Sequence, residues 1–102
     1  MQAFAALADP TRQRIVELLA EREYLAGELA RRFDMTPPAV SQHLRTLREA
    51  GLVTVRRDAQ RRIYALDPAG LAEVDAWLSR FRRFWTIRLD ALERRLTEGD
   101  HR

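Results

Sequence analysis

The chain has 102 residues, of which 46% are hydrophobic and 32% are charged; this suits one folded domain and is too short for two independent cores. No apolar run approaches the roughly 18 to 20 residues that span a bilayer, and the amino-terminal segment lacks the pattern of a secretory signal, so we expect a soluble, cytoplasmic protein without a membrane partner. The absence of cysteine excludes disulfides and thiolate metal sites, and the net charge of +3 is too small to identify a partner by itself.

Three prolines follow a short polar residue where a helix is expected to begin: Asp9-Pro10, Thr36-Pro37 and Asp67-Pro68. A side-chain oxygen just ahead of a helix accepts hydrogen bonds from its first free N–H groups, and proline suits the first helical position. These sites divide the chain into its elements. Before the first of them, residues 2–8 place Phe4 and Leu7 at helical spacing, with little to pack against unless the segment docks elsewhere.

Two helices are expected between residues 10 and 33. The first is amphipathic, ends near Glu21 and takes its buried face from residues at helical spacing: Ile15, Leu18 and Leu19. The second is shorter and is marked by Leu25, Leu29 and Phe33.

A third helix is expected from Thr36 to Ala50. Its inner face carries Val40, Leu44 and Leu47. Gly51 follows it in the position where helices often end in a left-handed residue.

A β-hairpin is expected after Gly51, because Val53 and Val55 alternate with polar residues and residues 63–66 form a second β-prone run. The residues between the runs, 56–62, are polar and strongly basic, which suits an exposed tip. Their centre, Asp58-Ala59-Gln60, contains no glycine, so we expect a longer loop instead of a tight two-residue turn.

One long helix is expected over about residues 68–96, since its apolar residues recur near a 3.5-residue period. Trp77, Phe81, Phe84 and Trp85 are half of the eight aromatic residues, and a small domain cannot easily cover both sides of this helix. We therefore predict a two-fold homodimer interface formed by residues 2–8 and 68–96. Its residues are Phe4, Leu7, Leu71, Val74, Leu78, Phe81, Trp85 and Leu89. Two other interpretations are open: the aromatic residues complete the monomer core, or they add an effector pocket at the dimer seam.

The predicted fold is mainly α-helical with a small β-hairpin, in the order of a winged helix-turn-helix domain. The helix-turn-helix covers about residues 25–50 and the wing about 52–66. Six arginines and only two acidic residues lie between residues 36 and 66, whereas positive and negative side chains nearly balance before and after this segment. A basic block on these elements favours double-stranded DNA as the partner.

The outer face of the third helix carries side chains that suit DNA. Gln42 can pair with adenine and Arg45 with guanine or phosphate, and the Thr36 and Ser41 hydroxyls can reach phosphates. The predicted contacts are Thr36, Pro38, Ala39, Ser41, Gln42, His43, Arg45, Arg56, Arg57, Arg61 and Arg62. For His43 we favour a structural or phosphate-contacting role over metal ligation. The alternative for the whole face is an ordinary solvated helix surface.

Several segments in order resemble the ArsR family of bacterial winged-helix transcriptional regulators. They are Phe4-Ala5-Ala6-Leu7-Ala8-Asp9-Pro10-Thr11-Arg12-Gln13-Arg14-Ile15, Glu28-Leu29-Ala30, Pro38-Ala39-Val40-Ser41-Gln42-His43-Leu44 and Leu47-Arg48-Glu49-Ala50-Gly51-Leu52-Val53. The resemblance covers about residues 3–70. It implies a homodimer that binds an operator palindrome and usually represses transcription until an effector releases it, with residues 36–45 as recognition segment and 56–62 as wing.

The chain departs from the metal-sensing members of that family. Where those members carry a Cys-x-Cys pair, this sequence has Leu25 and Gly27, and Glu73 and Asp75 on the last helix have no histidine nearby. The resemblance is therefore to the metal-independent branch, and we expect neither a metal nor a cofactor. The effector, a small molecule or a protein, is left open.

Two other function classes compete with DNA binding. An enzyme lacks support, because no glycine-rich phosphate loop, nucleophile elbow or catalytic triad spacing occurs. A protein-docking winged helix is the stronger rival, but it has no need of four arginines on an exposed hairpin.

Overall fold

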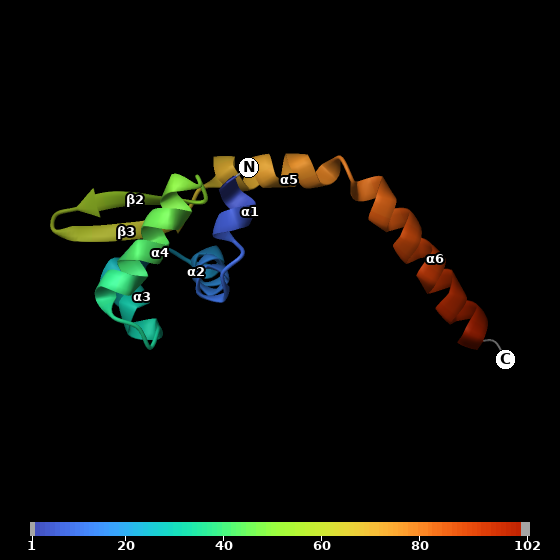
Figure 1. Cartoon of the computed structure of the whole chain (residues 1–102), viewed down its shortest axis with the longest axis horizontal. Helices are drawn as coiled ribbons and strands as arrows, with labels where there is room; N and C mark the ends of the chain where they lie inside the picture. The colour runs from blue at the N-terminus through green and yellow to red at the C-terminus, as the bar shows by residue number, and fades with distance from the viewer. Residues whose placement is uncertain (1, 101–102) are drawn as a thin grey trace. The chain divides into compact units, whose positions relative to one another are not determined.

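The computed structural model describes residues 2–100 and contains two compact units that divide after Ala72. As predicted, the fold is mainly helical with a small antiparallel sheet (Figure 1). The elements in chain order are α1 (Gln2–Ala6), α2 (Pro10–Glu21), β1 (Tyr24–Leu25), α3 (Ala26–Arg32), α4 (Pro37–Glu49), β2 (Val53–Asp58), β3 (Arg61–Leu66), α5 (Pro68–Ser79) and α6 (Arg82–Asp100).

The three predicted helix starts are confirmed. The Asp9 carboxylate accepts a hydrogen bond from the Arg12 backbone N–H at 3.0 Å, and the Thr36 hydroxyl accepts one from the Ala39 N–H at 3.3 Å. Asp67 Oδ1 accepts one from the Ala69 N–H at 3.0 Å. Each cap satisfies a backbone donor that the first helical turn leaves free.

The core of the first unit lies between the helices and the sheet. The predicted inner faces of α2 and α4 are confirmed as buried, and further buried side chains come from α3 and the sheet. They are Ile15, Leu18, Leu19, Tyr24, Leu29, Val40, Leu44, Leu47, Leu52, Val53 and Tyr64.

The sheet has three strands, in the order β1-β3-β2, so the prediction of a hairpin alone missed β1. Leu25, which we placed on a helix, pairs with Ile63 in β1, beside the pair of Tyr24 with Tyr64. The next helix starts after Leu25 because the Glu28 carboxylate accepts a hydrogen bond from the Leu25 N–H at 2.9 Å.

The predicted long loop at the hairpin tip is wrong. Strand pairing continues to Asp58 and Arg61, which leaves a two-residue turn of Ala59 and Gln60. Ala59 adopts a φ of 58°, a left-handed conformation that glycine would adopt more easily. The Arg61–Asp58 ion pair, at 2.6 Å, closes the strands beside this turn.

The end of α4 lies directly against the beginning of α5. Gly51 has a φ of 79°, as expected for a residue that ends a helix. The Asp67 N–H donates to the Leu52 carbonyl at 2.9 Å. A Cβ atom added at Gly70 would overlap the carbonyl oxygen of Gly51. The first turn of α5 can therefore lie this close to Gly51 only because Gly70 has no side chain.

The predicted single helix over residues 68–96 is also wrong, because α5 ends at Ser79 and α6 begins at Arg82. The Ser79 hydroxyl donates to the Asp75 carbonyl at 2.8 Å, a contact that often bends helices. Tight backbone bonds follow, from Arg80 N–H to the Trp77 carbonyl and from Phe81 N–H to the Leu78 carbonyl. Neither these helices nor the others in the described range are long and apolar enough to cross a membrane.

Candidate DNA-binding surface

Helix α4 presents the predicted contact residues on one outer face, while Val40, Leu44 and Leu47 anchor its inner face in the core. Thr36, Pro38, Ser41, Gln42 and Arg45 are exposed, and Ala39 is partly exposed. The side chains of Pro38, Ala39 and Ser41 are small, so the edge of a DNA groove can come close to this face of α4.

Two polar side chains dominate the outer face. The Gln42 side-chain amide makes no hydrogen bond within the described part of the chain, and its backbone carbonyl accepts one from the Thr46 hydroxyl at 3.1 Å. Arg45 Nε donates to the Glu49 carboxylate at 3.0 Å, with both side chains more than half exposed. Since exposed pairs of this kind contribute little, Arg45 can exchange Glu49 for a phosphate or a base at small cost.

His43 is turned toward the start of α2. Its Nδ1 lies 3.2 Å from a guanidinium nitrogen of Arg12 and 3.9 Å from the Asp9 carboxylate. Arg12 also donates to the carbonyls of Ala6 and Ala5, at 2.5 and 3.4 Å. The hydrogen bond from the Arg12 N–H, with the charges of His43 and Arg12, holds the pKa of the Asp9 carboxyl below its usual value. These contacts favour the structural role among the two we considered for His43, with only Nε2 left to reach a phosphate.

Strand register divides the four wing arginines into two pairs. Arg57 lies opposite Arg62, on the same face as the buried side chains of Val53 and Tyr64. Arg56 lies opposite Ile63, on the other face with the pair Asp58–Arg61. The two pairs of arginines therefore serve different surfaces of the hairpin.

The outer pair forms exposed ion pairs, which, like that of Arg45 with Glu49, can be broken at small cost. Arg56 bonds to the Glu23 carboxylate at 2.8 Å, and Arg61 bonds to Asp58. The hydrogen bond from Arg56 keeps the pKa of the Glu23 carboxyl below its usual value. Arg57 and Arg62 form no ion pair within residues 2–100. Of the four predicted wing residues, these two can meet a partner without first breaking an ion pair.

Arg62 lies at the junction of the wing and α4. A hollow of about 200 Å³ is lined by Ser41, Leu44, Arg45, Arg48, Arg62 and Tyr64. Arg48 was missing from our predicted contacts, although its place three residues after Arg45 on an exposed turn would have suggested it. The structure thus brings three guanidinium-bearing residues together at the junction of α4 with β3.

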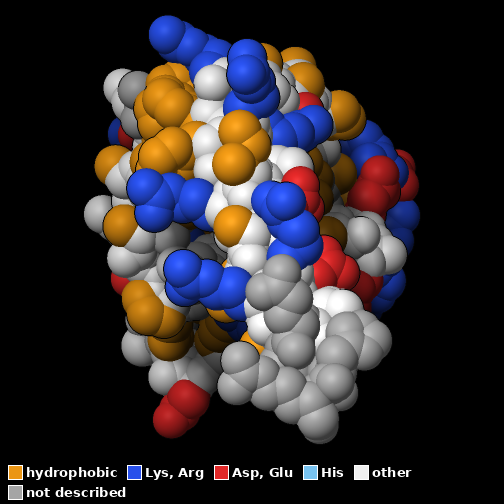
Figure 2. Space-filling model, turned by 90° about the vertical axis from the view of Figure 1, so that its right-hand side faces the viewer, with side chains coloured by type: hydrophobic (Ala, Val, Ile, Leu, Met, Phe, Trp, Pro, Cys, Tyr) orange, Lys and Arg blue, Asp and Glu red, His pale blue; other side chains and the backbone are white. Residues whose placement is uncertain are grey.

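The predicted dimer residues expose much apolar surface. Along α5, the break after it and α6, the side chains of Leu78, Phe81, Trp85 and Leu89 are 36 to 59% exposed, and Phe4 on α1 is 38% exposed. Leu7, Leu71 and Val74 are partly exposed. Figure 2 shows hydrophobic side chains interspersed with arginines on the face that carries α6. The exposed apolar side chains of residues 78–89 indicate an interaction surface.

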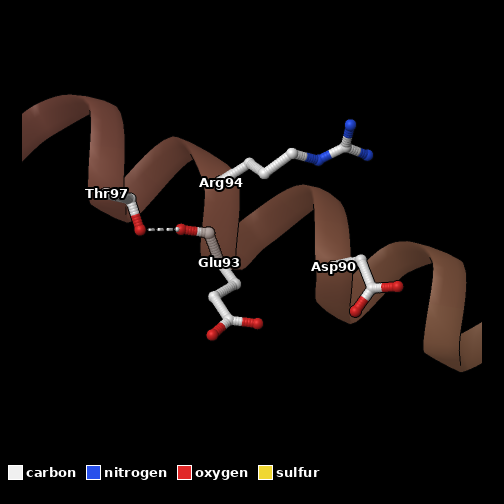
Figure 3. A pocket seen from close by; sticks show the side chains of 4 residues that line it. All are labelled: Asp90, Glu93, Arg94 and Thr97. Carbon is white, nitrogen blue, oxygen red and sulfur yellow. Dashed lines mark hydrogen bonds between the residues drawn. The ribbon is translucent and has the colours of Figure 1, made fainter.

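A hollow beside α6 is not a ligand site. Its volume is about 610 Å³, but the lining residues whose side chains the structure describes, Asp90, Glu93, Arg94 and Thr97, all lie on one helix (Figure 3). The Thr97 hydroxyl donates to the Glu93 carbonyl at 3.0 Å. One helix cannot enclose a ligand, so this hollow is the open polar side of α6.

No group of three potential metal ligands gathers among residues 2–100. His101, the second histidine, lies outside the described residues. Leu25 and Gly27 stand at the start of α3, with no metal-binding atoms in their side chains.

Comparison with known proteins identifies a matching family model and several similar proteins. Residues 9–55 match the family model described as bacterial regulatory protein, arsR family. The HTH-type transcriptional regulator Rv2034 of Mycobacterium tuberculosis is 47% identical over 100 residues, covering 97% of this chain and 91% of its own. The transcriptional repressor SdpR of Bacillus subtilis is 33% identical over 78 residues, which are 76% of this chain and 87% of SdpR. A crystal structure of a possible transcriptional regulator for arsenical resistance, 46% identical, matches with a TM-score of 0.72 over 79% of this chain and 84% of that one.

Proposed function

Because this chain belongs to the arsR family of bacterial transcriptional regulators, we propose that it is a homodimeric repressor that binds a palindromic operator through α4 and the wing. The relatives are regulators, a class that generally lacks enzymatic activity, and SdpR, a repressor by name, supports the direction of control. The proposed DNA contacts are the predicted residues of α4, with Arg57 and Arg62 as the principal wing residues and Arg48 added.

One observation carries the proposal. The unpaired wing arginines, Arg57 and Arg62, share one face of the hairpin, and Arg62 lines one hollow with Ser41 and Arg45 of α4. A polyanion that follows the surface from α4 to the wing would meet positive charge and base-reading groups together. The rival proposal, a protein-docking winged helix, gives no reason for this arrangement.

Dimerisation supplies the operator geometry. Two α4 helices related by a two-fold axis can enter successive major grooves only if they are about 34 to 36 Å apart. The exposed stripe of Leu78, Phe81, Trp85 and Leu89 supports such an axis, because isologous contacts use the same patch on both copies. Any effector that changes this spacing would weaken binding. Since the chain contains no cysteine, we propose that release does not use a cysteine-bound metal.

The Gln42→Ala substitution should relax base preference without a general loss of DNA affinity. Gln42 can form two hydrogen bonds to adenine, and a good bidentate contact discriminates by roughly 1–3 kcal/mol. We expect random-sequence DNA to bind nearly as before, while one position in each half-site loses its preference. Selection of bound sequences from a randomised duplex pool measures this. Equal losses on operator and random DNA would remove the assignment.

The wing pairs predict a difference between two neighbouring arginines. Arg62→Ala should weaken binding to all duplexes alike and lower the slope of log K against log salt by about one unit, as expected for one lost phosphate contact. Arg61→Ala should have a smaller effect, because Arg61 is already paired with Asp58. Fluorescence anisotropy across a salt series compares the two variants. The same slope change in both variants would contradict the division of the wing arginines into one pair with ion-pair partners and one pair without.

A mobility-shift assay on the DNA upstream of the protein's own gene, repeated across a salt series, tests the proposed function. We expect a discrete complex that resists excess random duplex and weakens steeply with salt. Failure to bind any duplex in dilute buffer would favour the docking interpretation.

A further inference from the structure

A second hollow lies between α3, α4 and β3. It measures about 380 Å³, within the range of small-molecule sites. Its lining residues come from all three elements: Ala26, Gly27, Ala30, Arg31, Pro37, Val40, Ser41, Leu44 and Arg62. Unlike the hollow on α6, it therefore has walls on several sides.

The inner part of this hollow is apolar. Helix α3 contributes Ala26, Gly27 and Ala30, whose small side chains leave the space empty, and Val40 and Leu44 lie beneath as core residues. An apolar surface of this kind gains free energy when an apolar group covers it. Bare phosphate would not make use of it.

The rim of the hollow is cationic. Arg31 comes from α3 and Arg62 from β3, and no acidic residue lines this hollow. Neither arginine forms an ion pair in the described part of the chain, whereas Arg22, Arg45, Arg56 and Arg61 all do. Glu28 lines the adjoining hollow, but its carboxylate already accepts from the Leu25 N–H and from Arg22. Two guanidinium groups therefore border an apolar floor without forming an ion pair, although the charge of Arg31 helps to lower the pKa of the Glu28 carboxyl, after the hydrogen bonds from the Leu25 N–H and Arg22.

We propose that this hollow binds an amphipathic organic carboxylate, with the anionic group between Arg31 and Arg62 and the apolar body over Ala26, Ala30 and Pro37. Guanidinium groups bind carboxylates through charge-assisted, often bidentate hydrogen bonds, and a compact hydrocarbon body matches the floor. An uncharged molecule of the same shape would leave both guanidinium groups unmatched.

Occupancy of this hollow would oppose DNA binding. Ser41 on the outer face of α4 and Arg62 on the wing both line it, so a bound carboxylate occupies groups that the duplex needs. This consequence rests on the proposed function, whereas the binding of a carboxylate to the free protein does not.

Octanoate and uncharged 1-octanol serve as the two probes, with binding to the full-length protein followed by backbone amide chemical shifts in the absence of DNA. We expect octanoate to shift the amides of Gly27, Ala30 and Ser41 saturably, and 1-octanol to bind at least about tenfold more weakly. Arg31→Ala should weaken octanoate binding several-fold. Arg32→Ala is the matched control, since Arg32 is exposed on the same helix and does not line the hollow.

Ala30→Leu provides an independent test, because it fills the hollow and leaves both arginines in place. It should abolish octanoate binding and keep the amide spectrum of a folded chain. Equal binding of the two probes, shifts outside the hollow, or octanoate binding that survives Ala30→Leu would overturn the proposal. If octanoate shifts no amide at millimolar concentration while Arg31→Ala weakens duplex binding, the hollow is a phosphate contact and the proposal is likewise wrong.

Competition with DNA is measured separately. Octanoate should raise the apparent Kd for the operator with the parent chain and leave it unchanged with Ala30→Leu. A chain that bound no DNA would fail here and in the mobility-shift assay, yet would still show the octanoate shifts. Failure of the proposed function is thus distinguishable from failure of the carboxylate site.

Discussion

A Trp85→Glu chain is expected to sediment as a monomer at micromolar concentration and to bind its operator on the order of 100-fold more weakly than the parent chain. Trp85 lies on α6 with Leu89, Leu92 and Leu96, which follow at intervals of four, three and four residues and share its face. A carboxylate in the middle of this face would have to be desolvated in the interface. Loss of the dimer removes the gain from two linked recognition helices, which is typically a factor of 10² to 10⁴.

The Thr86→Glu substitution is the matched control for Trp85→Glu. Thr86 is exposed on the same helix, but helical spacing places it on the face of Asp90, Glu93 and Thr97. It adds the same charge outside the apolar face and should leave both the dimer and the operator affinity unchanged. Sedimentation velocity reports the oligomer, and circular dichroism checks that both chains remain folded. A Trp85→Glu chain that stayed dimeric would refute the proposed interface.

Gly70→Ala should destabilise the first unit by about 3 kcal/mol, at the upper end of what an overpacked site costs. The added methyl group would overlap the Gly51 carbonyl oxygen, which is backbone and cannot move aside like a flexible side chain. Relief requires a shift of either α5 or the residues after α4, where Asp67 is bonded to Leu52. For a domain of this size we expect the melting temperature to fall by more than about 10 °C.

Gly27→Ala makes the same chemical change where there is space. A methyl group at Gly27 would meet only a guanidinium nitrogen of Arg31, at 3.7 Å, which is ordinary contact. Because alanine favours helices over glycine, this chain should melt at the same temperature as the parent chain or slightly higher. Thermal unfolding of the two variants in one buffer makes the comparison. Equal melting temperatures would show that the contact between Gly70 and the Gly51 carbonyl is not tight.

Features that depend on neighbouring residues were predictable from the sequence. The caps at Asp9, Thr36 and Asp67 each need an oxygen two or three residues ahead of its donor. The buried faces of α2 and α4 follow from helical spacing. Strand β1 was not predictable, because two residues are too few to show alternation and its pairing with β3 spans about forty residues of sequence.

The hairpin turn shows why part of the candidate site could not be derived. The absence of glycine favours a long loop, yet strand pairing and the Arg61–Asp58 contact hold Ala59 at a positive φ. Turn length also fixes strand register, and register decides that Arg57 and Arg62 share one face. The sequence therefore supplied the four wing arginines but could not separate the free pair from the paired one. The neighbourhood of Arg31 and Arg62 in the hollow beside α3 was missed because it joins residues about thirty apart in the sequence.

Hydroxyl-radical footprinting of the operator, combined with the sedimented mass of the complex, tests the central claim most directly. A two-fold pair of α4 helices with basic wings predicts two chains per duplex. It also predicts two protected backbone segments whose centres lie one helical turn, about 10 base pairs, apart. One chain per duplex, or a single protected segment, would contradict it.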